Sequence, residues 1–354
     1  MLALAPLLLL VLARAAAVGA VGAAEGHHLQ FMSVFGTDPQ LQRGTVNLAH
    51  RSYGNSNPWD QFELAANNSV QLWEQFGIAS LYGPLPYDQP AAEKGMPGRW
   101  GEYGNIFMHT GPKGDAVLAP GWQATLTEIV NRYIKPQFGI GKPFRGVRLG
   151  DEVCLSTVCL MQTLGPVAAF LKGALGPTLI ISSQEMRGVY PGFPNYPASA
   201  PQVPAAIDLV CATGGYGGYS PGESGIEEAS HAKTALTPWL RSSSLRSYQR
   251  VMLLPGIFGC KNTSYFGTPQ EQGVRVAAKL DAYYAWAKTE PKVAGFDPWH
   301  FDDRTEKQWN GPCDQRMGAA AMPAAVAKLQ QIGREIIANH KTDDASAAAP
   351  PHHY

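Results

Sequence analysis

The chain has 354 residues, of which 45% are hydrophobic and 16% are charged. This composition supplies a sizeable apolar core and excludes an intrinsically disordered protein. Lys and Arg together number 28, as do Asp and Glu, so the formal net charge is zero. A neutral chain has no basic field to hold nucleic acid or an anionic membrane, and we expect neither as a partner.

The first 24 residues have the pattern of a secretory signal peptide. Residues 2–12 are almost wholly apolar, small residues follow, and Gly22-Ala23-Ala24 provides a cleavage site. We therefore expect a mature protein that begins near Glu25, is secreted or lumenal in the secretory pathway, and leaves the membrane after cleavage. An uncleaved anchor is the alternative, although Arg14 makes the apolar run short for a membrane span.

Two N-glycosylation acceptor triplets fit a secreted protein: Asn67-Asn68-Ser69 and Asn262-Thr263-Ser264. Each triplet alone is a common pattern, and their value lies in agreeing with the N-terminal segment. We therefore expect a glycoprotein.

The chain has five cysteines, so at least one is free or paired between chains. Cys260 and Cys313 follow two late strands and could bridge adjacent loops. Cys154 and Cys159 could pair locally, and Cys211 lies in an apolar strand and is expected to be a buried thiol. No Cys-x-x-Cys pattern supports a zinc site, and we expect no metal and no cofactor.

The rest of the chain alternates short apolar runs with longer helical patterns. Strands are expected over residues 31–35, 46–49, 78–82, 146–150, 179–182, 207–212, 251–254 and 293–296. Helices are expected over residues 61–76, 122–134, 157–175, 225–241, 270–288 and 322–339, with apolar residues at helical spacing over 274–286.

This alternation predicts an α/β protein with a parallel sheet. About eight strands fit a single (β/α)8 TIM barrel domain over residues 25–340, with long βα loops such as the Gly- and Pro-rich stretch 84–105. A doubly wound open sheet is the competing architecture, but it more often uses about five or six strands. Residues 341–354 are expected to form a disordered tail.

The predicted fourth strand ends on two adjacent carboxylates, Asp151 and Glu152. Because strand side chains alternate between faces, the apolar residues 147 and 149 should face covering helices, which leaves Arg148 and Glu152 on the opposite face. In a parallel barrel Glu152 would lie at the C-terminal rim, where such folds carry their chemistry. The structural alternative is that Asp151 caps the next helix and Glu152 pairs with a surface Arg.

Asp297 and Trp299 follow the predicted eighth strand. If Phe296 faces the helices, alternation directs both residues toward the barrel mouth. A carboxylate and an indole suit a sugar ring, whose apolar face stacks on the aromatic while polar groups bind the hydroxyls. The alternative is that Trp299 belongs to the core and that Asp302 and Asp303 form salt bridges.

Other predicted strands end on residues of the same character. His50 follows the second strand, Tyr82 the third, Glu185 the fifth and Tyr216 the sixth. The Gly-rich loop around Tyr216 does not have the spacing of a dinucleotide or phosphate loop. We therefore place these four residues in a candidate substrate site.

The carboxylate after the fourth strand, the indole after the eighth and the secretory signal resemble a secreted (β/α)8 glycoside hydrolase. Such enzymes commonly place their acid/base Glu after the fourth strand, where Glu152 stands, and the resemblance implies a carbohydrate ligand. The adjacent Asp151-Glu152 pair also resembles that of retaining hexosaminidases, in which the substrate acetamido group is the nucleophile. The largest barrel clan places a nucleophilic Glu after the seventh strand, but residues 254–259 here contain no carboxylate.

Glycosidic cleavage usually needs two carboxyl groups. The prediction is therefore a glycosidase with Glu152 as general acid/base, Asp151 favouring its protonated form, and Asp297 as the preferred second carboxyl. One alternative is a barrel that binds glycans without cleaving them. Another is a phosphodiesterase barrel, because His50-Arg51 resembles the start of glycerophosphodiester phosphodiesterases, although residues 78–84 lack that family's Glu-x-Asp metal pair.

Overall fold

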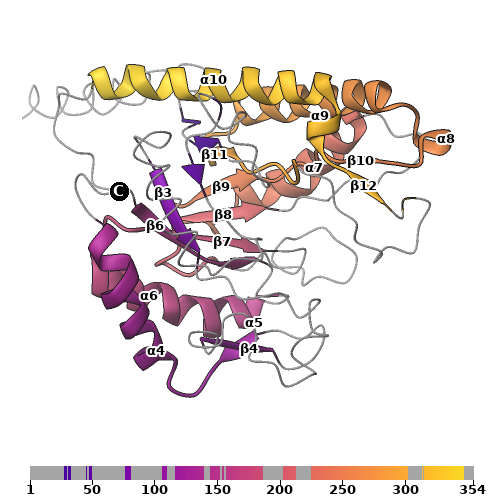
Figure 1. Ribbon diagram of the computed structural model, residues 1–354. Coiled ribbons are helices and arrows are strands. Elements are labelled where there is room, and N and C mark those ends of the chain that lie inside the picture. The colour runs from indigo at the N-terminus through magenta and orange to yellow at the C-terminus, as the bar shows by residue number, and fades with distance from the viewer. Residues whose placement is uncertain are drawn as a thin grey trace, which may run out of the picture.

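The computed structural model of the chain describes residues 28–29, 31–32, 45, 48–49, 76–80, 106–109, 116–138, 144–151, 154, 157–185, 202–212, 225–301, 313 and 315–346. Within this part of the chain, the fold is built on one eight-stranded parallel sheet surrounded by helices (Figure 1). The predicted signal peptide, residues 1–24, lies outside the described residues.

Eight strands form the main sheet, and every recorded pairing between neighbours is parallel. In chain order they are β1 (Phe31–Met32), β2 (Leu48–Ala49), β3 (Phe76–Ser80), β6 (Phe144–Asp151), β7 (Ile180–Glu185), β8 (Leu209–Ala212), β9 (Arg250–Leu253) and β11 (Val293–Phe296). Their order across the sheet is β1-β11-β9-β8-β7-β6-β3-β2. The first of these eight strands, β1, therefore lies beside the last, β11, and from β2 onward each strand lies beside its successor in the sheet.

Two short antiparallel ribbons accompany the sheet. β4 (Phe107–His109) pairs with β5 (Ala116–Leu118), and β10 (Gly259–Cys260) pairs with β12 (Arg316–Met317). Neither ribbon is expected from the sequence, because runs of two or three residues carry too little alternation to be recognised. The second ribbon matters most for function, because it joins the segments that follow β9 and β11.

The helices are close to those expected from the sequence. They are α4 (Trp122–Ile129), α5 (Thr157–Cys159), α6 (Gly165–Leu175), α7 (Gly225–Leu240), α8 (Thr263–Phe266), α9 (Pro269–Ala287) and α10 (Pro323–Ser346). A π-helical turn over Val130–Ile134 and a 3-10 turn over Lys135–Gln137 extend α4, another π turn over Leu160–Leu164 joins α5 to α6, and a 3-10 turn over Ala319–Ala321 precedes α10. In the view of Figure 1, α9 and α10 lie above the strands and α4 and α6 lie below them.

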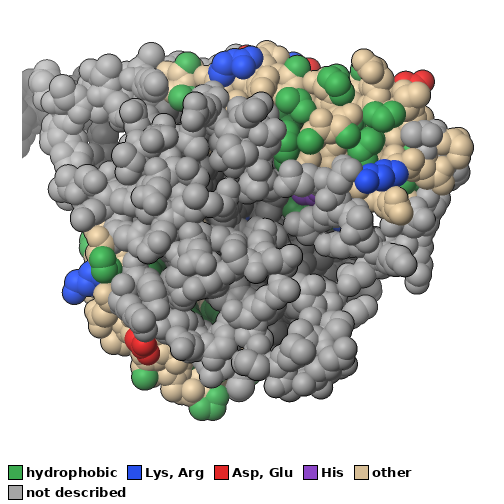
Figure 2. Space-filling model, in the orientation of Figure 1, with side chains coloured by type: hydrophobic (Ala, Val, Ile, Leu, Met, Phe, Trp, Pro, Cys, Tyr) green, Lys and Arg blue, Asp and Glu red, His purple; other side chains and the backbone are tan. Residues whose placement is uncertain are grey.

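Helix α9 illustrates why these segments are helical. Thr268 caps its first turn and forms a capping box with Glu271, and Pro269 occupies the first helical position. Its buried residues include Val276, Leu280, Tyr283 and Ala287, which recur at helical spacing. Val274 belongs to the predicted apolar stretch but is 60% exposed, and Figure 2 shows hydrophobic side chains at the surface over this helical layer.

Two apolar clusters occupy the two faces of the sheet. The larger one joins the helices to outward strand residues such as Val210 and Val251. The smaller one consists of Leu209, Cys211, Met252, Leu254 and Ala294. All of its members come from strands or strand ends, so we call the face they share the inner face. Residues next to each other along β8 and β9 fall in different clusters, as strand alternation requires.

Several predicted boundaries need correction. Residues 61–75 of the first predicted helix lie outside the described part, and its last residue, Phe76, begins strand β3 instead. Strand β7 continues to Glu185, so residues 183–185 belong to the strand and not to the loop after it. Helix α10 continues to Ser346, which places residues 341–346 of the predicted tail in a helix. No helix in the described part of the chain is long and apolar enough to span a membrane.

The cysteine predictions are confirmed. Cys154 is bonded to Cys159 and Cys260 to Cys313, whereas Cys211 is a buried thiol that belongs to neither disulfide. The Cα–Cα distances are 5.3 and 5.6 Å, within the usual range for disulfides.

Candidate active site

A buried ion pair crosses the inner face of the sheet. Arg148 Nη1, from β6, lies 3.5 Å from Asp297 Oδ2, which directly follows β11, and the two side chains are 1% and 0% exposed. Three strands separate β6 from β11, so a flat sheet would hold them about 19 Å apart at the usual spacing of about 4.8 Å. The sheet must therefore curl strongly enough for the fourth and eighth strands to face each other.

Strand β6 positions Arg148 as the alternation predicts. Val147 and Leu149 belong to the larger, helix-covered cluster, which leaves Arg148 on the inner face. The alternation does not continue undisturbed, because the register with β7 shifts between Arg148 and Asp151. Asp151 pairs with Gln184 of β7, so the strand continues to the first of the two carboxylates. The facing of Asp151 and Glu152 therefore cannot be assigned from simple period-two counting.

Strand β11 delivers Asp297 to the same inner face. Its backbone N–H donates to the carbonyl oxygen of Leu253, 2.8 Å away, which prolongs the pairing with β9 beyond the last strand residue. The guanidinium attracts a negative charge on Asp297, whereas burial opposes charge on a carboxyl group. The ion pair holds the Asp297 side chain against β6 on the inner face.

Trp299 stands two residues further on, in a cluster of rings and one guanidinium. Its ring meets Phe258 edge-on at 5.2 Å between centroids and His300 at 4.4 Å, and Phe258 stacks on His300 at 5.6 Å. The guanidinium carbon of Arg316 lies 4.8 Å from the Trp299 ring centroid and 4.9 Å from that of Phe258. Trp299 also packs against the inner apolar cluster while remaining partly exposed. Trp299 therefore supports the inner apolar cluster and still offers part of its surface to a ligand.

Sequence reasoning missed three members of this cluster: Phe258, His300 and Arg316. His300 could have been found, because it directly follows Trp299. Arg316 could not, because its place depends on the pairing of β10 with β12 and on the disulfide between Cys260 and Cys313. These contacts bring the segments after the seventh and eighth strands of the main sheet together.

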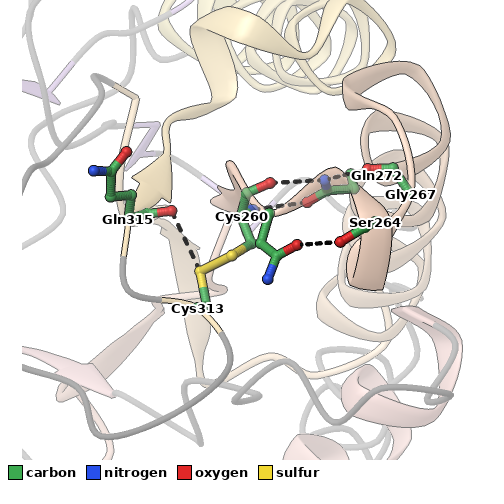
Figure 3. The surroundings of a disulfide bond; sticks show 7 residues. Cys260, Ser264, Gly267, Gln272, Cys313 and Gln315 are labelled. Carbon is green, nitrogen blue, oxygen red and sulfur yellow. Dashed lines mark hydrogen bonds between the residues drawn. A yellow bond between two sulfur atoms is a disulfide. The ribbon is translucent and has the colours of Figure 1, made fainter.

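Figure 3 shows how that disulfide is anchored. The side-chain oxygen of Gln272, on α9, accepts a hydrogen bond from the Cys260 N–H at 2.7 Å. Its Nε2 donates to the carbonyl oxygens of Cys260 at 2.9 Å and Gly267 at 2.7 Å. A buried amide with both ends bonded holds Cys260 against α9, and so holds the ribbon that carries Arg316.

The second disulfide follows the predicted carboxylates closely in the sequence. Cys154 is fully buried and is joined to Cys159 at the end of α5, five residues along the chain. The hydroxyl of Thr163 donates to the Ala116 carbonyl oxygen at 2.8 Å, which attaches the following turn to β5. The disulfide therefore fixes the chain at Cys154, which is two residues after Glu152 in the sequence.

Several predicted site residues cannot be placed. Glu152, His50, Tyr82 and Tyr216 lie outside the described residues, as do Asp302 and Asp303, and the side chains of Asp151 and Glu185 are not described although both end strands. Among the residues that are described, no group of three or more His, Cys, Asp or Glu side chains could hold a metal ion.

No family model and no curated relative matches this sequence. Solved structures do resemble it. A β-glucuronidase of Faecalibacterium prausnitzii is 14% identical, with a TM-score of 0.54 over 87% of this chain and 49% of its own. A β-glucuronidase of Ruminococcus gnavus is 11% identical, with a TM-score of 0.52 over 86% and 50%. A β-glucuronidase of Bifidobacterium dentium, complexed with coumarin-3-O-glucuronide, is 13% identical, with a TM-score of 0.50 over 86% and 46%.

This chain spans about half the length of those enzymes. At such low identity the likeness shows only a shared fold, which here is an α/β fold with a parallel sheet.

Proposed function

We propose that the protein is a glycoside hydrolase whose site lies at the C-terminal ends of a closed (β/α)8 barrel. The strand order supports closure, because β1 already pairs with β11 and only β2 remains to be joined to β1. The curl that the Arg148–Asp297 pair requires supports it as well. The shared fold with β-glucuronidases is a third, independent support.

One observation carries the proposal: the Arg148–Asp297 ion pair joins the fourth strand to the end of the eighth. Because Glu152 follows the same fourth strand, we place it over the mouth that Asp297 and Trp299 border. Glu152 then acts as general acid, protonating the leaving glycosidic oxygen. Asp297 supplies a negative charge that accepts a hydrogen bond from a substrate acetamido group or an attacking water. Trp299 offers its exposed part to the sugar.

The remaining predicted residues complete this proposal. Asp151 would favour the protonated form of Glu152, as adjacent carboxylates do. His50, Tyr82, Glu185 and Tyr216 would contact sugar hydroxyls from the other strand ends. The names of the fold neighbours make a glucuronide one of the substrates to be tried first.

Secretion and glycosylation form a second part of the proposal. Two disulfides fit a protein made in an oxidising compartment. Asn262 is exposed, and the hydroxyl of Ser264 donates to its side-chain oxygen at 2.7 Å, so the acceptor triplet is accessible at the surface. We propose that Asn262 carries an N-linked glycan and that the mature chain begins near Glu25. Mass spectrometry of protein from the medium of secreting cells tests both, and an unmodified Asn262 or a retained Met1 contradicts them.

The decisive assay compares Glu152→Gln with the parent on unactivated glycosides chosen from a panel that includes glucuronides and N-acetylhexosaminides. Loss of a general acid should lower kcat by about 10²–10⁴-fold while ligand affinity and folding survive. Asp151→Asn should have a smaller effect, and Glu271→Gln at the exposed start of α9 is the matched control. Unchanged turnover in Glu152→Gln removes this residue from the mechanism.

A glycan-binding barrel without catalysis is the second candidate, and one observation favours it. The segment that follows β9 contains no carboxylate and packs its backbone against Trp299. Binding of oligosaccharides by a parent that cleaves none of the panel, with affinity lost in Trp299→Ala, identifies this second function.

A further inference from the structure

Residues 255–257, which follow the seventh strand β9, form a platform for Trp299. The Trp299 N–H donates to the Pro255 carbonyl oxygen at 3.0 Å, and the Ile257 N–H donates to the Trp299 carbonyl oxygen at 2.6 Å. Gly256 and Trp299 thus form an isolated parallel bridge beyond the ends of β9 and β11. The backbone direction at residues 255–257 therefore sets the direction of Trp299.

Glycine lets the Phe258 ring pack closely on this platform. A Cβ at residue 256 would lie 3.0 Å from the Phe258 ring, which folds back over the segment. The same ring meets Trp299 edge-on. Platform and aromatic cluster are therefore one packed unit, and whatever fixes Gly256 also fixes the surroundings of Trp299.

A buried charge lies beneath the platform. Lys279, on α9, donates from Nζ to the Gly256 carbonyl oxygen at 3.0 Å. Its ammonium also pairs with Glu228 of α7, and the two side chains are only 4% and 8% exposed. Gly225 lets the start of α7 approach α9 here, because a Cβ there would lie 2.2 Å from the Arg275 carbonyl oxygen and 2.8 Å from Lys279 Cβ.

The energetics of such a pair argue for a geometric role. Removing two charges from water costs about as much as their attraction returns, so a buried pair can often be replaced by apolar residues without loss of stability. The negative charge of Glu228 also acts on Tyr283 of α9, because burial and that charge together raise the pKa of the Tyr283 hydroxyl. What an apolar pair could not reproduce is the directed hydrogen bond from Lys279 to Gly256.

We propose that Lys279 and Glu228 are positioning residues that orient Trp299 through the carbonyl group of Gly256. The functional value of this orientation rests on the proposed function, because it assumes that Trp299 contacts the sugar. The orientation itself can be measured without any substrate. In the largest barrel clan the segment after the seventh strand carries the nucleophile. In this protein the same segment would instead support Trp299, on which the sugar rests.

The test combines three variants with fluorine NMR of protein labelled with 5-fluorotryptophan. The double variant Glu228→Gln/Lys279→Met removes both charges and the hydrogen bond to Gly256 but keeps side-chain volumes similar. Lys279→Arg keeps the charge and a donor. Lys172→Met/Asp208→Asn is the matched control, because it removes an ion pair of 2.8 Å at the opposite ends of the strands.

The chain has eight tryptophans, and the resonance of Trp299 is assigned from Trp299→Phe. We expect this resonance to shift or broaden in the Glu228/Lys279 double variant and to stay near its parent position in Lys279→Arg and in the control. Trp239 on α7 and Trp286 on α9 should keep their resonances, which shows that the helices themselves are undisturbed. The melting temperature of the double variant should stay within about 5 °C of the parent's.

An unchanged Trp299 resonance overturns the proposal, as does a change shared equally by all three tryptophans. Kinetics form the second arm. On the glycoside that the parent hydrolyses best, KM should rise about tenfold in the double variant, equivalent to roughly 1.4 kcal/mol, with kcat changed less. A parent that hydrolyses nothing contradicts the proposed function alone, and the fluorine result still decides the positioning role.

Discussion

Gln249 and Asp208, at the N-terminal ends of the strands, bind backbone groups of neighbouring turns, whereas Arg148, at the opposite ends, pairs with a side chain from a distant strand. Before β9, the buried Gln249 donates to the carbonyl oxygens of Pro204 at 2.9 Å and Ile207 at 2.8 Å. Before β8, Asp208 accepts from the Ile181 N–H at 2.7 Å and pairs with Lys172. Each of these side chains ties one turn to the next.

At the C-terminal ends, Arg148 instead reaches Asp297 across the inner face, and Arg316 lies over Trp299 and Phe258. These contacts join segments far apart in the chain and leave Trp299 partly exposed. In parallel barrels the N-terminal face generally serves stability and the C-terminal face carries the chemistry. The contrast predicts that changes at the first face alter stability alone, whereas changes at the second also alter ligand binding or turnover.

The largest effect is expected at the Arg148–Asp297 pair. Arg148→Met leaves the Asp297 carboxylate buried without this partner, which should lower the free energy of unfolding by about 3–5 kcal/mol. The double variant Arg148→Met/Asp297→Asn should regain much of that stability but not the turnover. Denaturant unfolding combined with glycoside assays separates the two effects. Full recovery of activity in the double variant would show that the pair is structural.

The two disulfides give the next contrast. The chain-entropy relation assigns about 4 kcal/mol to the Cys260–Cys313 bridge, with its sequence separation of 53, and about 2 kcal/mol to Cys154–Cys159, with a separation of 5. Replacing each pair with serines and measuring urea unfolding tests this order. We also expect loss of Cys260–Cys313 to weaken sugar binding, because it frees the ribbon that carries Arg316. Equal losses from both pairs would mean that native packing, not loop closure, dominates.

Gln249 provides the test at the opposite ends of the strands. Gln249→Leu has a similar volume but removes the side-chain donor to the Ile207 carbonyl group and leaves the Pro204 carbonyl group with the Ile207 N–H alone, at a cost of about 1–3 kcal/mol in unfolding free energy. At 25 °C the folded variant should keep the KM and kcat of the parent. A changed KM in a correctly folded variant would contradict the prediction that changes at the N-terminal ends of the strands alter stability alone.

The smallest effect concerns the start of α9. Thr268→Ala should cost about 1 kcal/mol, the usual value of an N-cap side chain. Hydrogen bonds from the Thr268 N–H and hydroxyl lower the pKa of Glu271 from its usual 4.5. The resulting stabilisation of the folded state is complete well above pH 4.5 and is lost as the pH falls through the lowered pKa of Glu271. Thr268→Ala lacks the hydroxyl hydrogen bond, so it should lose less stability than the parent over that acidic range. Thermal melts between pH 2 and 6 measure both quantities, and an unchanged pH profile would assign no role to the Thr268 hydroxyl.

Much of the fold could be predicted because it follows local patterns. Strand β11 has the bounds expected from its apolar run. The Cys260–Cys313 disulfide joins cysteines that follow two late strands, and Cys154–Cys159 is the local pair that the sequence suggested. The site was only partly predictable. Alternation places Arg148 correctly, but the register shift before Asp151 depends on how β6 and β7 meet, which no local pattern encodes. Arg316 owes its position to a ribbon of two-residue strands and a bridge between distant cysteines.

The central claim is that the carboxylates ending the fourth strand and the Asp297–Trp299 segment face each other over one barrel mouth. A crystal structure of Glu152→Gln, soaked with the glycoside that the parent hydrolyses best, tests it most directly. We expect β1 to pair with β2, the sugar to lie against Trp299, and the side chains of residues 152 and 297 to flank the glycosidic bond. A residue 152 that points into the helical layer, or a sugar bound away from Asp297, would contradict the account.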